Sequence, residues 1–129
     1  MLFTNTLSSW YNFNNDLGVS SQAVSDDGAN FYQWAIDSVS YNSASEVCEA
    51  YNTKVFSGRT NWRLAELDEL QVLFDSNGPI ERNWPVKSSY VSNTESSPGY
   101  HSNILLSDGS LGSIAENSSS QYVSCISEP

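Results

Sequence analysis

The side chains of this sequence that could do covalent or metal chemistry are one histidine, two cysteines, fifteen carboxylates and many serines. His101 has no second histidine and no spare cysteine, so a zinc site of ordinary composition cannot be built. A Ser-His-Asp set could be assembled from His101, Asp108 and any of many serines, but the Gly-x-Ser-x-Gly nucleophile elbow is absent. No spacing singles out two carboxylates for glycoside hydrolysis. The sequence therefore predicts that the chain is not an enzyme and that His101 is a plain exposed histidine.

Cys48 and Cys125 lie in patterned parts of the chain, the first in a predicted helix and the second in a predicted closing strand. If they bond, the covalent tie closes most of the sequence into one loop and constrains the unfolded chain by roughly 4–5 kcal/mol. Structural disulfides persist in the periplasm, on cell surfaces and in secreted proteins. The pair therefore favours an extracellular or cell-surface protein, and two buried free thiols are the alternative.

The charge balance excludes several classes of partner. Fifteen acidic residues against five basic ones give a net charge of −10, so the phosphate neutralisation on which nucleic-acid binding depends has no source. An anionic membrane surface repels such a chain, and no apolar run is long enough to span a bilayer. Serine, asparagine, tyrosine and tryptophan are plentiful, as in surfaces that recognise ligands. The composition predicts a binding module with no nucleic-acid partner and no membrane insertion.

The length of 129 residues predicts a single domain, residues 1–129, built around one core. The start, Met1-Leu2-Phe3, lacks the basic region and long apolar stretch of a secretory signal. Either a signal has been removed or the chain is a module excised from a larger exported protein, and we favour the excised module.

Two amphipathic helices are predicted in the middle of the chain. Ser43 and Glu46 have the Ser-x-x-Glu spacing of a capping box at a helix start. This first helix should end near Asn52 and bury one face, formed by Ala44, Val47, Cys48 and Tyr51. The second helix should bury a face formed by Leu67, Leu70, Leu73 and Phe74 and stop at Asn77-Gly78-Pro79.

The remaining segments are predicted to be loops and strands. One or two short strands are expected within residues 1–29, and an aromatic strand within Asn30–Val39. After the second helix and a Trp84-Pro85 loop, the predicted strands are Tyr90–Thr94, His101–Leu106, Ser110–Ile114 and Gln121–Ile126, with a tight turn at Asp108-Gly109. The predicted helices come first along the chain and the strands of an antiparallel sheet come last. This order indicates an α+β fold.

A series of short motifs follows a fixed order between residues 31 and 127. The motifs are Trp34, the helix with Ala44 and Cys48, Asn61-Trp62-Arg63-Leu64, Leu67-Asp68-Glu69-Leu70, Tyr90-Val91-Ser92-Asn93-Thr94, Leu106-Ser107-Asp108-Gly109 and Tyr122-Val123-Ser124-Cys125. This order resembles a bacterial domain family with a Trp-Arg-Leu-Pro-Thr…Glu-Leu signature, found at the C-terminal ends of collagen-like surface adhesins. The sequence departs from the family pattern in two places: Ala65 and Glu66 stand in place of Pro-Thr, and Val91 stands in place of a tryptophan.

The resemblance implies a variant of the C-type lectin-like fold, in which two helices flank a small twisted antiparallel sheet. In that fold a first-helix cysteine bonds one on the last strand, which implies a Cys48–Cys125 disulfide. We expect Trp62 to be core and Arg63 to pair with an acid of the second helix's first turn or with a backbone carbonyl. The signature is then scaffold, and the module is an adhesin domain on a bacterial surface.

Sugar-binding members of the wider lectin fold hold calcium through a Glu-Pro-Asn or Gln-Pro-Asp triplet and a later Trp-Asn-Asp, because Ca²⁺ needs several clustered oxygen ligands. Neither triplet is present in this sequence. No cofactor is therefore predicted with certainty, and a structural calcium held by Asp or Glu stays open.

Trp84 stands in a loop, where an indole has less reason to be buried. Its aromatic face, beside Glu81 and Asn83, could stack on a sugar ring or fill a pocket on a partner protein. Further side chains expected to line the same loop face are Glu95, Tyr100, His101, Asn103, Glu116 and Asn117.

These residues predict an adhesion module that recognises a glycan or another molecule on a host or neighbouring cell through its loop face. One alternative is a protein-receptor-binding tip of the intimin or invasin kind, which uses the same fold without calcium. Another is a structural stalk cap without a ligand.

Overall fold

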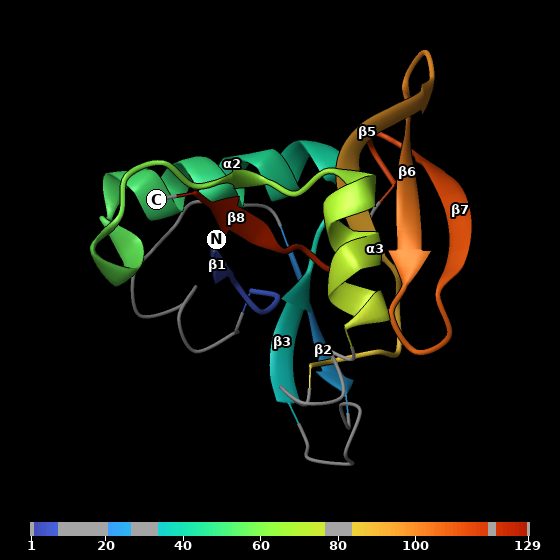
Figure 1. Ribbon diagram of the computed structural model, residues 1–129, viewed down its shortest axis with the longest axis horizontal. Helices are drawn as coiled ribbons and strands as arrows, with labels where there is room; N and C mark the ends of the chain where they lie inside the picture. Colours follow the sequence, from blue (N-terminus) through green and yellow to red (C-terminus); the bar gives the residue numbers. More distant parts are fainter. Residues whose placement is uncertain (1, 8–20, 27–33, 77–83, 119–120, 129) are drawn as a thin grey trace.

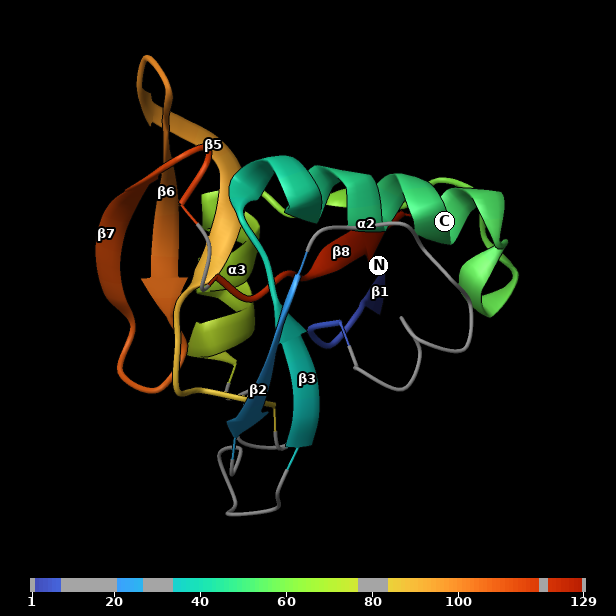
Figure 2. The same ribbon diagram turned by 180° about the vertical axis from the view of Figure 1, so that it is seen from behind.

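The computed structural model describes residues 2–7, 21–26, 34–76, 84–118 and 121–128. Figures 1 and 2 show helices lying beside small antiparallel sheets within this described part. The elements in chain order are β1 (Leu2–Phe3), β2 (Gln22–Asp26), β3 (Trp34–Ser38), α2 (Tyr41–Thr53), the 3₁₀ helix η1 (Phe56–Gly58), β4 (Arg63–Leu64), α3 (Leu67–Asp75), β5 (Tyr90–Ser97), β6 (Tyr100–Leu105), β7 (Ser110–Ala115) and β8 (Cys125–Ser127). The predicted α+β class is confirmed.

The named strands pair antiparallel in sheets of order β1-β8-β4, β2-β3 and β5-β6-β7. The chain segment 121–127 connects these sheets. Gln121 forms a bridge with Val39, and Tyr122 forms one with Tyr90, before β8 pairs with β1 and β4. All seven residues of this segment are buried, so it passes through the centre of the fold.

Helix α2 forms where the sequence predicts it, but its start differs. Ser40 is the N-cap, with extended backbone and a side chain that accepts the Ser43 amide at 3.3 Å. Ser43 therefore lies inside the first turn, and the predicted Ser43–Glu46 capping box is wrong. The apolar face is confirmed, because Ala44, Val47, Cys48 and Tyr51 are all buried.

Helix α3 begins one residue after Glu66, as its apolar spacing predicts. The Glu69 carboxylate accepts the Glu66 amide at 2.9 Å, which satisfies one of the free N–H groups at the helix start. Leu70 and Leu73 are buried. The helix ends at Asp75, and the predicted Asn77-Gly78-Pro79 exit lies outside the described residues.

The C-terminal half carries the predicted tight turn at Asp108-Gly109, between β6 and β7. Gly109 has the positive φ of +80° that a tight turn requires, and Asp108 Oδ1 accepts the Ser110 amide at 2.9 Å. The last strand is shorter than predicted and spans Cys125–Ser127. The strand is short because the residues before Cys125 hydrogen-bond to a side chain instead of to a neighbouring strand. The Thr6 hydroxyl, for example, accepts the Val123 amide at 3.0 Å.

The predicted disulfide is confirmed. Cys48 on α2 is bonded to Cys125 on β8, with the Cα atoms 5.7 Å apart. The bond lies in a core cluster that includes Val47, Val91 and Val123. A second cluster packs under α3 and includes Leu70, Leu73, Trp84, Tyr90, Tyr122 and Ile126. The tie therefore fixes α2 against the central chain segment.

Candidate functional site

The β5–β6 hairpin brings several predicted site residues together. Glu95 lies opposite His101, and Ser97 opposite Tyr100. The Glu116 amide donates to the Gly99 carbonyl at 3.1 Å, which places the turn after β7 beside the hairpin. We call Glu95–Tyr100 together with Glu116 and Asn117 the hairpin tip. In Figures 1 and 2 the end of this hairpin stands clear of the rest of the described chain.

Local sequence explains the shape of the hairpin tip. The strands reverse at Pro98-Gly99, and Gly99 has a φ of +80°. Proline followed by a glycine with positive φ is the favoured centre of a type II turn. Register shifts on both sides of Glu95 interrupt the ladder, and such bulges bend and twist a strand. The Ser96 and Ser113 hydroxyls lie 2.6 Å apart and tie the bent strand to β7.

Three predicted site residues on the hairpin tip face solvent. Glu95 and Asn117 are exposed, and the Tyr100 side chain retains 47% of its accessible surface. An exposed tyrosine beside carboxylates and an amide offers apolar area together with hydrogen-bonding groups. The hairpin tip can therefore bind a partner surface without any covalent chemistry.

His101 lies under the hairpin tip and is not exposed. Only 4% of its surface is accessible, so the prediction of a plain exposed histidine is wrong. Its ring stacks on Tyr41 at the start of α2, with centroids 3.5 Å apart. Its Nε2 lies 3.1 Å from Glu116 Oε1, and its buried Nδ1 has no hydrogen-bond partner among the described residues. His101 therefore joins the hairpin to α2 and to the turn after β7.

Asn103, two residues further along β6, is also buried. Its side-chain amide donates to Gln121 Oε1 at 3.0 Å. A Cβ on Gly112 would lie only 2.6 Å from Asn103 Oδ1, so a larger residue there would require the Asn103 side chain to shift. In this structure Asn103 supports the sheet and does not line the loop face.

Trp84 does not join the other predicted site residues. Its side chain is 3% exposed and stacks on Tyr90, with ring centroids 5.8 Å apart. Tyr90 begins β5, whereas the hairpin tip lies at the other end of that strand. The expected exposed indole is therefore wrong, because the loop folds back onto the core under α3. Glu81 and Asn83, the predicted neighbours of this indole, lie outside the described residues.

The Trp-Arg-Leu segment is scaffold, as expected. Trp62 is 5% exposed, and its Nε1 donates to the Phe56 carbonyl at 2.9 Å. Arg63 forms two hydrogen bonds with Glu69, at 2.7 and 2.8 Å. The guanidinium holds the pKa of the Glu69 carboxyl below its usual range. This pair fixes β4 to the first turn of α3.

Asp26 is a buried carboxylate that the sequence analysis missed. It is 2% exposed and accepts the Lys87 amide and the Tyr122 hydroxyl, each at 2.7 Å. Burial and this hydrogen bond raise the pKa of Tyr122 well above its ordinary value. The carboxylate therefore closes the end of β2 over the second core cluster. Among the described residues, no group of three or more His, Cys, Asp or Glu side chains could hold a metal ion.

The sequence matches the InvE_AD family, described as an adhesion domain, over residues 13–126. No curated protein matches it. The matched range contains α2, α3, the hairpin tip and both cysteines. Because the match covers most of the chain, the protein belongs to the InvE_AD family of adhesion domains.

Proposed function

We propose that this domain binds a protein on another cell surface and that the hairpin tip is its contact surface. The observation that carries the proposal is the exposed Tyr100 on a projecting hairpin whose base is held by His101. Tyrosines in such positions are frequent energetic centres of protein interfaces. Glu95, Glu116 and Asn117 supply a polar rim around it.

The anchoring favours this surface energetically. Association has to offset the entropy of every loop and side chain that becomes ordered on binding. The stack of His101 on Tyr41 and the contact with Glu116 order the base of the hairpin beforehand. Less entropy is then lost when Tyr100 meets its partner.

Membership of an adhesion-domain family supports an exported or surface location and a non-enzymatic role. Within the described residues, no helix has the length and apolar character needed to cross a bilayer. We further assign the domain to the C-type lectin-like class. Two helices beside small antiparallel sheets, and a disulfide from α2 to the last strand, support that assignment.

The shape of the remaining exposed surface favours a protein receptor over a glycan. An exposed Trp84 ring could have stacked on a sugar or filled a pocket on a partner protein. That ring is packed against Tyr90 instead. The aromatic side chain that remains exposed near the predicted polar residues is Tyr100, on a protruding hairpin rather than in a sugar-sized groove.

Attachment of beads coated with the domain to a panel of cultured cells tests the proposal. Tyr100→Ala should weaken attachment tenfold or more, and protease treatment of the cells should abolish it. The matched control is Leu111→Ala, since Leu111 is 57% exposed on β7 and lies opposite Ile104 rather than at the hairpin tip. Unchanged attachment by Tyr100→Ala would overturn the proposal.

A glycan array with and without a chelator separates the alternatives. Glycan binding that is lost on chelation would contradict the protein receptor and would indicate a calcium-dependent lectin. Gel filtration that gave a stable trimer, together with no attachment to any cell, would support the stalk cap instead.

A further inference from the structure

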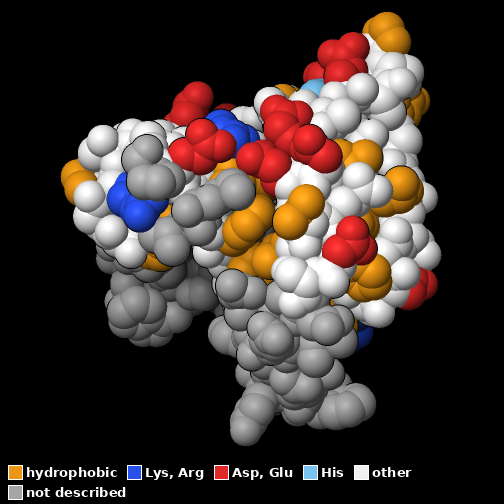
Figure 3. Space-filling model, viewed as in Figure 1, with side chains coloured by type: hydrophobic (Ala, Val, Ile, Leu, Met, Phe, Trp, Pro, Cys, Tyr) orange, Lys and Arg blue, Asp and Glu red, His pale blue; other side chains and the backbone are white. Residues whose placement is uncertain are grey.

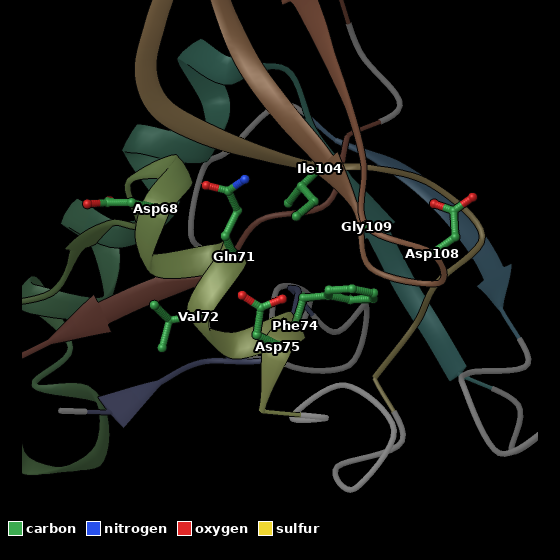
Figure 4. A pocket seen from close by; sticks show the side chains of 8 residues that line it. All are labelled: Asp68, Gln71, Val72, Phe74, Asp75, Ile104, Asp108 and Gly109. Atoms are coloured by element: carbon green, nitrogen blue, oxygen red, sulfur yellow. The ribbon is translucent and has the colours of Figure 1, made fainter.

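A hollow of about 450 Å³ opens between α3 and the β6–β7 turn. Figure 4 shows its lining residues. They are Asp68, Gln71, Val72, Phe74, Asp75, Ile104, Asp108 and Gly109. The hollow lies near Leu105, where β6 ends, whereas the hairpin tip begins that strand with Tyr100. It is therefore a separate surface.

The hollow has an apolar floor. The Phe74 ring projects from α3 toward the β6–β7 turn (Figure 4) and passes so close to Gly109 that a Cβ there would lie 2.8 Å from Cε1. Ile104 is 1% exposed, and Val72 at the rim is 64% exposed. Carbon atoms of Val72 and of the half-buried Phe74 thus meet solvent, and the apolar stem of a long side chain could lie there.

Carboxylates border this floor. Asp75 stands beside Phe74, and Asp108 lies across the hollow on the turn, whereas Asp68 points away from both (Figure 4). The hydrogen bonds from Ser110 keep the pKa of Asp108 below its usual range. Figure 3 shows apolar and acidic side chains side by side on this face.

No basic side chain of the described residues forms an ion pair with Asp68, Asp75 or Asp108. Arg63 pairs with Glu69 and Glu128, and Arg59 donates to Ser127. Lys87 donates to the Ser25 carbonyl. The negative potential at the hollow is therefore not neutralised by these three cations, and it attracts a positive group from outside.

We propose that this hollow binds a lysine or arginine side chain from a basic segment of a partner protein. The apolar stem would lie along Phe74, and the cationic head would reach Asp75 beside that ring or Asp108 on the turn. A cation near an aromatic face gains a further attraction. An acidic segment would be repelled by the same carboxylates, so the hollow would select partners by charge.

Titration of the peptide acetyl-Gly-Leu-Lys-Gly-Leu-Lys-Gly-amide into the ¹⁵N-labelled domain tests the proposal by NMR. Saturable shifts should appear at the backbone amides of Phe74, Asp75 and Gly109. The same peptide with norleucine or glutamate in place of lysine should bind at least tenfold more weakly. Raising the salt concentration should weaken binding of the lysine peptide, since exposed charges are screened over about 10 Å at 0.1 M salt.

The variant Asp75→Asn/Asp108→Asn should reduce affinity for the lysine peptide at least fivefold. The amide at 108 keeps an acceptor for the Ser110 amide, so the turn should remain folded. The matched control is Glu46→Gln/Glu49→Gln, which removes two exposed charges from α2 and should change affinity less than twofold. If both double variants lost the same affinity for the lysine peptide, the effect would come from net charge alone and the proposal would be overturned. Binding of the norleucine peptide as tightly as the lysine peptide would overturn it as well.

Tyr100→Ala should leave the lysine peptide bound with unchanged affinity. The hollow and the hairpin tip are thereby tested independently, and failure of one proposal is distinguishable from failure of the other.

Discussion

The imidazole of His101 lies flat on the phenol ring of Tyr41, with centroids 3.5 Å apart and ring planes inclined by 11°. The Tyr41 hydroxyl donates to Asn93 Oδ1 at 2.9 Å, and His101 Nε2 contacts Glu116 at 3.1 Å. The contact therefore joins the start of α2 to β5, β6 and the turn after β7. It links α2 to the projecting hairpin.

A double-mutant cycle on Tyr41 and His101 should show a coupling free energy of about 0.5–1.5 kcal/mol, since stacked rings contribute that much beyond their buried area. The measurement is urea unfolding of wild type, Tyr41→Ala, His101→Ala and the double variant. Tyr41→Phe is the control, because it keeps the ring and loses only the hydrogen bond to Asn93. Strictly additive losses would show that the stack contributes nothing of its own.

The helices could be predicted from the sequence because their signal is local. Apolar residues at helical spacing mark the buried faces of α2 and α3. The α2 face is buried as expected, whereas on α3 Leu70 and Leu73 are buried and Leu67 and Phe74 are partly buried. The start of α2 differs from the prediction because Ser40 and Ser43 can each cap a helix. Only the extended backbone at Ser40 decides between them, and that conformation is set by the bridge of the preceding Val39 with Gln121.

The site could be predicted only in part, because burial of loop residues depends on distant segments. Trp84 is covered by Tyr90 and the core under α3, and His101 by Tyr41 of α2. Asp26 has partners at Lys87 and Tyr122, far along the chain. Its sequence context, a polar stretch before a glycine, resembles an ordinary turn and carries no sign of burial.

Trp84→Ala should destabilise the fold by about 3–5 kcal/mol, as truncation of a buried tryptophan does. Chemical denaturation followed by circular dichroism gives the value. Tyr100→Ala serves as the exposed aromatic control and should change the free energy of unfolding by less than about 0.5 kcal/mol. A Trp84→Ala variant as stable as the wild type would return the indole to the list of ligand-binding residues.

Stability should fall in acid partly through Glu69. Arg63 lowers the pKa of this carboxyl from its ordinary value of 4.5, so the ion pair stabilises the fold above that pH and loses its effect as pH falls through the lowered value. Arg63 is 44% exposed, and solvent screening limits the contribution to about 0.5–1 kcal/mol.

The matched variant for this ion pair is Glu69→Gln, which removes the charge and keeps an acceptor for the Glu66 amide. Wild type should be the more stable protein at pH 7, and the two free energies of unfolding should converge as the pH falls below about 4. A difference that stays constant down to pH 2 would assign the effect of Glu69 to packing rather than to charge.

Reduction of the Cys48–Cys125 bond should cost about 4–5 kcal/mol, because the bond closes a sequence separation of 77 residues in the unfolded chain. Urea unfolding with and without dithiothreitol measures the loss, and reduction leaves the volumes of both sulfurs in the core. The control is Cys48→Ala/Cys125→Ala, whose stability should not respond to reductant.

Since the expected loss is comparable to the net stability of a small domain, the reduced protein should be largely unfolded at 37 °C. The fold would then depend on an oxidising environment such as a cell surface. A loss below about 1 kcal/mol would mean that packing around Val47 and Val123 holds α2 to the central segment without the covalent tie.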